Sequence, residues 1–208
     1  MPKRLNAASL ASGVRALSEA DKDLARVARV CGAPSMWERE PGFSTLVFII
    51  LEQQVSLASA RVAFERLLAA ASPLTPETFL ALDDATLRRA GFSRQKALYC
   101  KLAAGEIASG AFDLDSLEYS DDDAARAALL KLKGVGPWTA EIYLLRALLR
   151  PDAWPSGDLA LQVAAQEVKG LSARPNAAAL DELGERWRPL RAVAARLLWQ
   201  HYLRRRGA

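Results

Sequence analysis

The chain has 208 residues, 51% of them hydrophobic, and its formal net charge of +4 at pH 7 permits a polyanionic partner without requiring one. We expect a soluble globular protein, because the longest purely apolar run, 46–51, is far too short to span a bilayer, and the polar start resembles no secretory signal. The single histidine, His201, and the isolated Cys31 and Cys100 argue against a His-based triad and exclude a four-thiolate metal cluster.

The first third of the chain reads as helices that pack into a core. The spacing of apolar residues predicts one helix at about 14–30, which the turn beginning at Gly32 ends. A very apolar helix follows at 43–51, and Ser56 is a good N-cap for another helix at 57–71.

Two adjacent amides, Gln53 and Gln54, separate the two apolar helices at 43–51 and 57–71. A polar pair in this place is either a solvated corner or a surface that meets a polar ligand. The residues alone leave both interpretations open.

Two more helices are predicted before the middle of the chain. The first runs from a cap and a proline at 75–76 to Gly91, and the second runs from Gly91 to about 108. Arg94 and Lys96 at the start of the second helix are either phosphate contacts or part of a solvated helix start.

A helix, a glycine turn and a second helix are predicted at about 120–149. The turn 134–136 is Gly-Val-Gly, and Pro137 suits the first position of the following helix. Such a turn leaves the backbone bare, so that a phosphate could approach the N–H groups of the second helix, with Lys133 adding charge. Plain packing of a helical hairpin explains the same pattern.

The last part of the chain is again helical. Asp158 lies where a helix to about 168 could begin, and as an isolated residue it reads as an N-cap. Helices at 177–187 and from Pro189 onwards complete the pattern. The arginines crowded between 186 and 206 suit either a polyanion or a solvated helix face.

No stretch alternates like a strand and no repeat is present, so the fold class predicted from the pattern is all-α. Five segments carry a more specific signal: ILEQQVSLASA, GFSRQKALYCKLA, LKGVGPWTA, PSGDLAL and WRPLRAVAARLLW. Together they resemble the helix-hairpin-helix DNA glycosylases, in particular the alkylated-base branch of 3-methyladenine glycosylase II. The resemblance covers about residues 37–200. It implies one domain over 1–208, with two helical lobes flanking a cleft.

The resemblance also implies a reaction. Asp158 would be the catalytic carboxylate that hydrolyses the N-glycosidic bond of an extruded alkylated purine, such as 3-methyladenine or 7-methylguanine. Members that also nick the DNA strand have a lysine where this chain has Trp138, so the resemblance implies a monofunctional enzyme without strand cleavage.

The remaining site residues follow from matching positions in the motifs. The base pocket would contain Trp138, Leu159 and Trp199. DNA contacts would come from Gln53, Gln54, Lys133, Gly134, Val135, Gly136 and Thr139, with Gln54 as the wedge that fills the gap left by the extruded nucleotide. The main-chain carbonyls of Leu130, Leu132 and Gly134 would hold a monovalent cation, Na⁺ or K⁺.

The expected partner is double-stranded DNA with damaged bases, and we expect no required cofactor, no membrane, a monomer and a cytoplasmic location. Two alternatives stay open. Some relatives have a tyrosine where this chain has Ile142, and its absence keeps open a different lesion such as hypoxanthine or ethenoadenine. The second alternative is a DNA-binding module without turnover. The presence of Asp158 in its full motif argues against this alternative.

Overall fold

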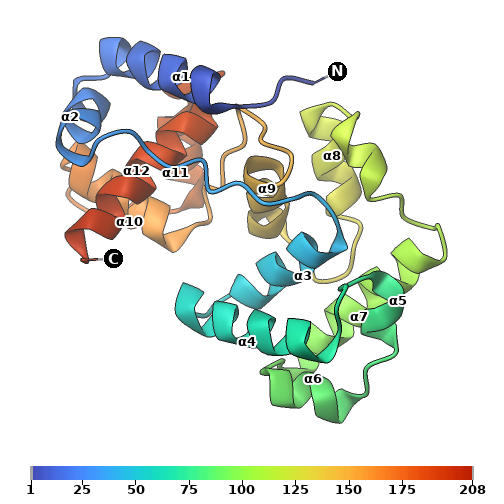
Figure 1. Cartoon of the computed structure of the whole chain (residues 1–208). Coiled ribbons are helices and arrows are strands. Elements are labelled where there is room, and N and C mark those ends of the chain that lie inside the picture. The colour runs from blue at the N-terminus through green and yellow to red at the C-terminus, as the bar shows by residue number, and fades with distance from the viewer. Residues whose placement is uncertain (1, 208) are drawn as a thin grey trace. The chain divides into compact units, whose positions relative to one another are not determined.

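The computed structural model describes residues 2–207, and the regular elements in this range are all helical (Figure 1), which confirms the all-α fold class. Met1 and Ala208, which the predicted domain span includes, lie outside the described residues. The α-helices are α1 (Ala7–Ala20), α2 (Lys22–Cys31), α3 (Phe43–Glu52), α4 (Leu57–Ala70), α5 (Pro76–Leu80), α6 (Asp84–Ala90), α7 (Arg94–Ala108), α8 (Asp122–Leu129), α9 (Pro137–Arg146), α10 (Leu159–Lys169), α11 (Ala177–Gly184) and α12 (Arg191–Arg205), with 3₁₀ turns at Asp115–Glu118 and Glu185–Trp187. Over this range, no helix is both long enough and apolar enough to cross a lipid bilayer.

Local capping signals start several helices where the sequence predicts. The Ser56 hydroxyl accepts the N–H of Ser59 at the start of α4, and the Asp121 carboxylate accepts the N–H of Ala124 at the start of α8. Pro137 is the first residue of α9, where its missing N–H leaves no hydrogen bond unmade.

Two predicted helices are each a pair of shorter helices. The stretch at 14–30 contains Asp21, whose carboxylate caps α2 and so ends α1. The stretch at 75–91 is divided in the same way, because Asp83 caps α6. Both acids lie inside an amphipathic pattern that continues across the break, and this continuity made the prediction of single helices wrong.

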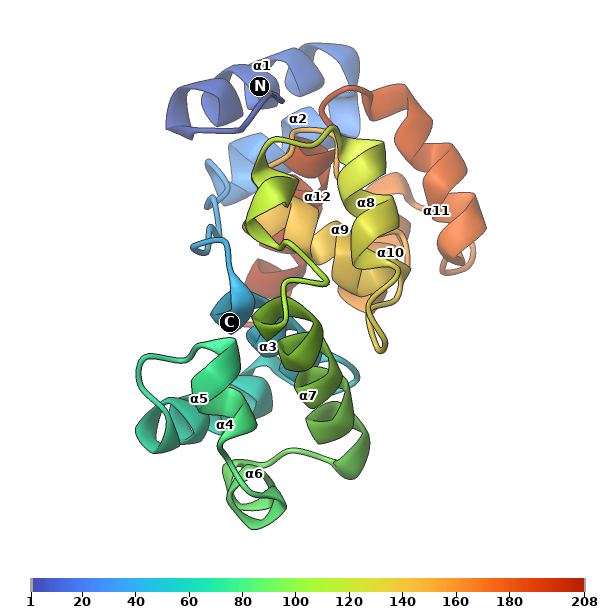
Figure 2. The same ribbon diagram turned by 90° about the vertical axis from the view of Figure 1, so that its right-hand side faces the viewer.

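The described chain divides into two compact units, and the division falls within α9, between Tyr143 and Leu144. The unit Arg39–Tyr143 is built around α3, of which eight of the ten residues are buried. Helices α4 and α7 pack against α3, while α5 packs against α7 and α6 against α4 (Figure 2). The core of this unit therefore fixes the position at which α3 ends.

The other unit comprises the chain up to Glu38 and the chain from Leu144 onwards, and α12 is its central helix. Residues 191–199 are all buried, and α1, α2 and α10 pack against α12. The buried Arg196 donates hydrogen bonds to the carbonyls of Met36 (3.0 Å) and Leu145 (2.9 Å). Burial lowers the pKa of this guanidinium to about 10, which leaves it charged at neutral pH.

Asp21 is a buried carboxylate that connects three elements of the same unit. Besides capping α2, it accepts hydrogen bonds from the Lys169 ammonium (2.6 Å) and the Trp187 indole N–H (2.9 Å). Burial acts to raise the pKa of Asp21, but the hydrogen bonds from Lys169, Trp187 and Leu24 and the charge of Lys169 outweigh it and lower the pKa below the ordinary value.

We expect Asp21→Asn to lower the free energy of unfolding by about 2–3 kcal/mol at pH 7, because Lys169 then loses its most buried counter-charge and keeps the more exposed Asp23. A depressed folded-state pKa stabilises the fold above the unfolded-state pKa, and this contribution is lost as the pH falls through the folded-state value. Urea unfolding at pH 7 and pH 3 should therefore show a gap between wild type and variant that narrows in acid. Asp84→Asn, an exposed ion-pair control, should leave the midpoint close to that of wild type. A gap of the same size at both pH values would contradict this account.

Candidate functional site

The predicted helical hairpin is formed by α8, the turn 134–136 and α9. In this turn Gly134 has φ +89°, and a Cβ atom at this residue would lie 2.2 Å from the ring of Tyr99. Gly134 is thus required both for its left-handed backbone and for the close approach of Tyr99. A Cβ atom on Gly136 would meet no atom within 4 Å, so its backbone faces open space.

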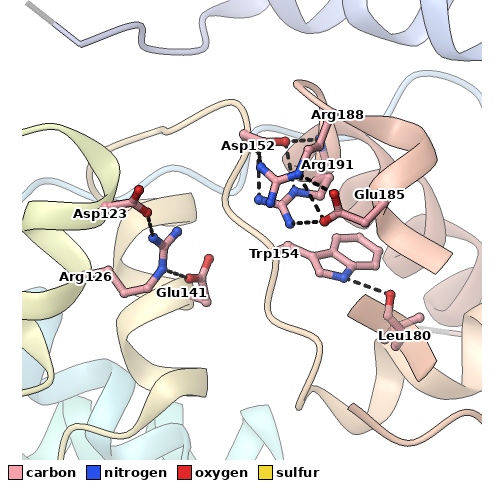
Figure 3. A network of polar contacts seen from close by, with 9 residues as sticks. All are labelled: Asp123, Arg126, Glu141, Asp152, Trp154, Leu180, Glu185, Arg188 and Arg191. Atoms are coloured by element: carbon pink, nitrogen blue, oxygen red, sulfur yellow. Dashed lines mark hydrogen bonds and ion pairs between the residues drawn. The ribbon is translucent and has the colours of Figure 1, made fainter. Parts of the chain in front are cut away.

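An ion pair fastens the two helices of the hairpin to each other. Arg126 of α8 contacts Glu141 of α9, and it also pairs with Asp123 one turn earlier on α8 (Figure 3). The two carboxylates raise the pKa of the Arg126 guanidinium although burial acts to lower it. The turn between the helices is therefore held at both of its ends.

The Gln-Gln pair adjoins the hairpin in the same unit. The Gln53 side-chain amide donates to the Gly134 carbonyl (3.0 Å) and to the Thr139 hydroxyl (2.9 Å). Gln54 is exposed and has φ +57°, a left-handed conformation that residues other than glycine rarely adopt. The two amides thus differ in environment, since Gln53 joins the hairpin while Gln54 extends into solvent.

A cavity of about 470 Å³ lies beside these elements. Residues 53–54 line one part of it and the hairpin turn 134–136 lines another. The start of α7 supplies the rest through Ser93, Gln95, Lys96 and Tyr99. Five of the seven residues predicted to bind DNA therefore lie around one cavity.

The other predicted hairpin residues differ in accessibility. Lys133 is exposed, whereas the side chains of Val135 and Thr139 are buried, with Thr139 only 2% exposed. A contact from either buried residue to a ligand would have to come from the backbone. Among the predicted cation ligands, the Leu132 carbonyl accepts the N–H of Val135 (3.0 Å), and the Gly134 carbonyl accepts Gln53.

Asp158 and Trp199 meet in the other unit. Asp158 is the N-cap of α10, and its Oδ1 accepts the N–H of Leu161 (2.8 Å). The same oxygen accepts the indole N–H of Trp199 (3.0 Å). The sequence assigned these residues to two separate motifs, and the structure joins them by a direct hydrogen bond.

Two further side chains surround the Trp199 ring. Trp37 meets it edge to face at a centroid distance of 6.1 Å, and the Arg146 guanidinium lies over the ring at 5.6 Å. Leu159, which the resemblance assigns to the base pocket, is 57% exposed next to Asp158. The immediate neighbourhood of the carboxylate is thus aromatic and carries a cation.

The segment that leads to Asp158 is held by polar contacts with α11, with α12 and with Arg188 in the connection between these helices (Figure 3). Asp152 accepts hydrogen bonds from Arg188 (2.6 Å) and Arg191 (2.9 Å), and the Trp154 indole N–H donates to the Leu180 carbonyl (3.1 Å). These anchors lie six and four positions before Asp158, so they restrict how far the carboxylate can move.

Trp138 of α9 is half-buried, and Ile142, one turn later, is buried. Tyr143 does not replace the tyrosine that is missing at 142, because its side chain is fully buried and its hydroxyl accepts the N–H of Gly42 (2.9 Å). Burial raises the pKa of this hydroxyl well above its usual value.

Sequence reasoning missed several residues that contact the predicted site residues in each of the two units. Lys96, for which it left two alternatives open, donates to main-chain carbonyls at the end of α3, and Tyr99 packs on the hairpin glycine. Trp37 and Arg146 gave no signal at all, because their contacts with Trp199 connect positions far apart in the chain. A capping preference is local, whereas these contacts depend on the tertiary fold.

Comparison with known proteins gives a consistent result. A family model described as the HhH-GPD superfamily of base excision DNA repair proteins matches residues 47–189. The chain is 27% identical over 192 residues to DNA-3-methyladenine glycosylase 1 of Schizosaccharomyces pombe, covering 88% of this chain and 84% of that protein. It is 30% identical to a Bacillus subtilis protein provisionally assigned as a DNA-3-methyladenine glycosylase (YfjP), where the match covers 76% of this chain but only 58% of that protein's length.

Solved structures agree with these sequence matches. A Schizosaccharomyces pombe 3-methyladenine DNA glycosylase in complex with abasic DNA has a TM-score of 0.85 and 26% identity, covering 91% of this chain and 95% of that chain. A DNA-3-methyladenine glycosidase from Bacillus halodurans has a TM-score of 0.77 and 28% identity, covering 91% and 88% of the two chains.

We expect Gly134→Ala to destabilise the protein by about 2 kcal/mol or more, because alanine opposes the left-handed backbone and its Cβ would overlap the Tyr99 ring. Gly136→Ala is the matched control and should cost about 1 kcal/mol or less, since space is open there and only an N-terminal helix position is affected. Chemical denaturation of both variants measures the difference. Equal losses at the two glycines would show that Tyr99 does not restrict Gly134.

Proposed function

Because the chain belongs to the HhH-GPD superfamily of base excision DNA repair proteins, we propose that it is a monofunctional DNA glycosylase that removes alkylated purines from double-stranded DNA. The observation that carries this proposal is the hydrogen bond between Trp199 and Asp158, which brings a flat aromatic surface and a carboxylate together. The relatives named as 3-methyladenine glycosylases support the same substrate class.

In the proposed reaction Asp158 acts on the sugar of the damaged nucleotide. Cleavage of the N-glycosidic bond leaves positive charge on the deoxyribose, and a fixed carboxylate beside it lowers the barrier electrostatically. The base leaves with the electron pair of the broken bond. Water then adds to C1′ and releases its proton to solvent. The N–H groups of Leu161 and Trp199 orient the carboxylate through Oδ1.

The base must leave the helical stack before this reaction, at a cost of a few kcal/mol. We propose that the hairpin turn grips the DNA backbone, with the bare backbone at Gly136 and the exposed charge of Lys133 close to a phosphate. Gln54 would fill the vacated position in the duplex, which its exposure supports. DNA contacts by the main chain at Val135 and Thr139 and base-pocket contacts by Trp138 and Leu159 remain predictions.

Two further parts of the proposal concern strand cleavage, which we expect to be absent, and a bound monovalent cation. Trp138 has no amine to form a Schiff base, so the product is an abasic site in an intact strand. The proposal also places a monovalent cation at the carbonyls of Leu130, Leu132 and Gly134. Each carbonyl oxygen has two lone pairs. Those of Leu132 and Gly134 already accept one hydrogen bond each, which leaves one lone pair on each oxygen for a cation. Such a cation would add positive charge beside the bound phosphate.

A second candidate substrate class is neutral lesions such as hypoxanthine or ethenoadenine. The Arg146 guanidinium lies over the Trp199 ring, at 5.6 Å from its centroid. A cationic base such as 7-methylguanine would be repelled by this positive charge when it approaches the ring, whereas a neutral base carries no net charge to be repelled.

We expect Asp158→Asn to reduce base release by about a thousandfold, because the neutral amide no longer stabilises the charge on the sugar. The measurement is chromatography of bases released from methylated DNA and from single-lesion duplexes. Asp181→Asn changes an exposed carboxylate on α11 and should release bases at the wild-type rate.

The same assay has outcomes that contradict the proposal. Unchanged release by Asp158→Asn would remove Asp158 from the reaction, and no release by wild type from any substrate would leave only a DNA-binding module. Strand breaks that appear without added alkali would show that the absence of lysine at 138 does not prevent strand cleavage.

Arg146→Met tests the effect of the cation at Trp199. If that charge disfavours cationic bases, the variant should release 7-methylguanine faster relative to hypoxanthine than wild type does, by about tenfold for a change of 1.4 kcal/mol. Initial rates on the two single-lesion duplexes give this ratio directly. An unchanged ratio in a folded variant would mean that Arg146 does not select the lesion.

A further inference from the structure

The end of α3 leaves main-chain carbonyls that helix geometry cannot satisfy. The Lys96 ammonium from α7 donates to two of them, those of Leu51 (2.7 Å) and Gln53 (2.8 Å). A cation at a helix C-terminus also complements the helix dipole. Lys96 therefore caps α3 from a helix that begins more than forty positions further along the chain.

This lysine is partly shielded from solvent. It is half-buried, and burial lowers the pKa of its ammonium. With two of its three N–H groups directed at carbonyls of the protein, the ammonium is already used within the fold. These contacts fit a residue that shapes the chain better than one that contacts a phosphate.

The carbonyl of Gln53, which Lys96 holds, belongs to the peptide group directly before Gln54. Gln54 has φ +57°, and a left-handed conformation of a residue other than glycine persists only where its surroundings impose it. The Gln53 side chain supplies the second restraint through the Gly134 carbonyl and the Thr139 hydroxyl. Lys96 thus holds the backbone of the turn while the Gln53 amide ties the turn to the hairpin.

Helix α7 contacts the hairpin as well. Tyr99, one turn after Lys96, packs its ring against Gly134, and its hydroxyl accepts the side-chain amide of Gln95 (2.6 Å). One face of α7 therefore touches both the end of α3 and the glycine turn. These are the two elements that the proposed function places on the DNA.

From these contacts we propose that Lys96 is a positioning residue for base extrusion, which fixes the Gln53–Gln54 turn so that the Gln54 side chain enters the duplex. The proposal rests on the proposed glycosylase function. Lys96 itself touches neither the damaged base nor the reacting sugar. Its effect reaches the reaction through Gln54.

The first test replaces the cation and measures the turn directly. Lys96→Met keeps the length of the side chain but removes its donors, so hydrogen exchange of the amides at 53–56 should speed up. Lys101→Met is the matched control, because Lys101 lies on the same helix and pairs only with the exposed Asp84 in the contacts described for this residue. Lys96→Arg retains donors for the two carbonyls and should restore slow exchange in part. Unchanged exchange in Lys96→Met would overturn the proposal.

The second test measures extrusion. Single-turnover base release by Lys96→Met should fall by about ten- to a hundredfold, the effect expected when a functional group is misplaced by about 1 Å. The KM for the duplex should change little, because Lys96 makes no DNA contact in this account. The fluorescence rise of a 2-aminopurine placed beside the lesion, which reports unstacking, should slow by the same factor. Lys101→Met should match wild type in every readout.

A double-mutant cycle separates positioning from general damage to the fold. If Lys96 acts through Gln54, Gln54→Ala alone should slow release, and adding Lys96→Met should cost little more. Additive losses, or wild-type extrusion by Lys96→Met, would overturn the proposal. Failure of the proposed function is distinguishable, because wild type would then release no base while the exchange measurement at 53–56 would still report on the turn.

Discussion

Helix ends carry backbone groups that have no partner within the helix, and the candidate functional residues of this protein gather where such ends must be satisfied. Asp158 satisfies the start of α10, and Lys96 satisfies the end of α3. The Gly136 backbone leads into the start of α9 and has open space before it. The same physical requirement thus supplies an oriented carboxylate, a fixed turn and a bare backbone surface.

The capping and the catalytic interpretations of Asp158 are compatible. A carboxylate at an N-cap is held by a backbone N–H, here that of Leu161, and so has a defined direction. The indole of Trp199 adds a second donor to the same oxygen. A group that must act on a developing charge benefits from being fixed in advance, because no reorganisation is then needed during the reaction. The structural role of Asp158 is therefore compatible with the chemical role that we propose for it.

The sequence predicts this protein well where the determining contact is local. Ser56 and Pro137 start helices as expected. The Ser56 cap and its partner lie within three residues, and the fixed φ of Pro137 suits the first helical position. The all-α class is likewise confirmed. The structure also places the Gln-Gln pair beside the glycine turn, around one cavity. The bond between Gln53 and Gly134 joins positions 81 apart, and that between Lys96 and Leu51 joins positions 45 apart. Such pairs depend on tertiary packing, which no single segment encodes.

The left-handed backbone at Gln54 limits what evolution can place at the tip of this turn. Valine, isoleucine and threonine are disfavoured there, since branching at Cβ crowds a positive φ, while glycine has no side chain to insert. Long unbranched or amide side chains tolerate the positive φ better and are also long enough to insert. Divergence among homologous enzymes at this position should therefore sample a narrow set of side chains, and a shift to a β-branched residue would have to be accompanied by a remodelled loop.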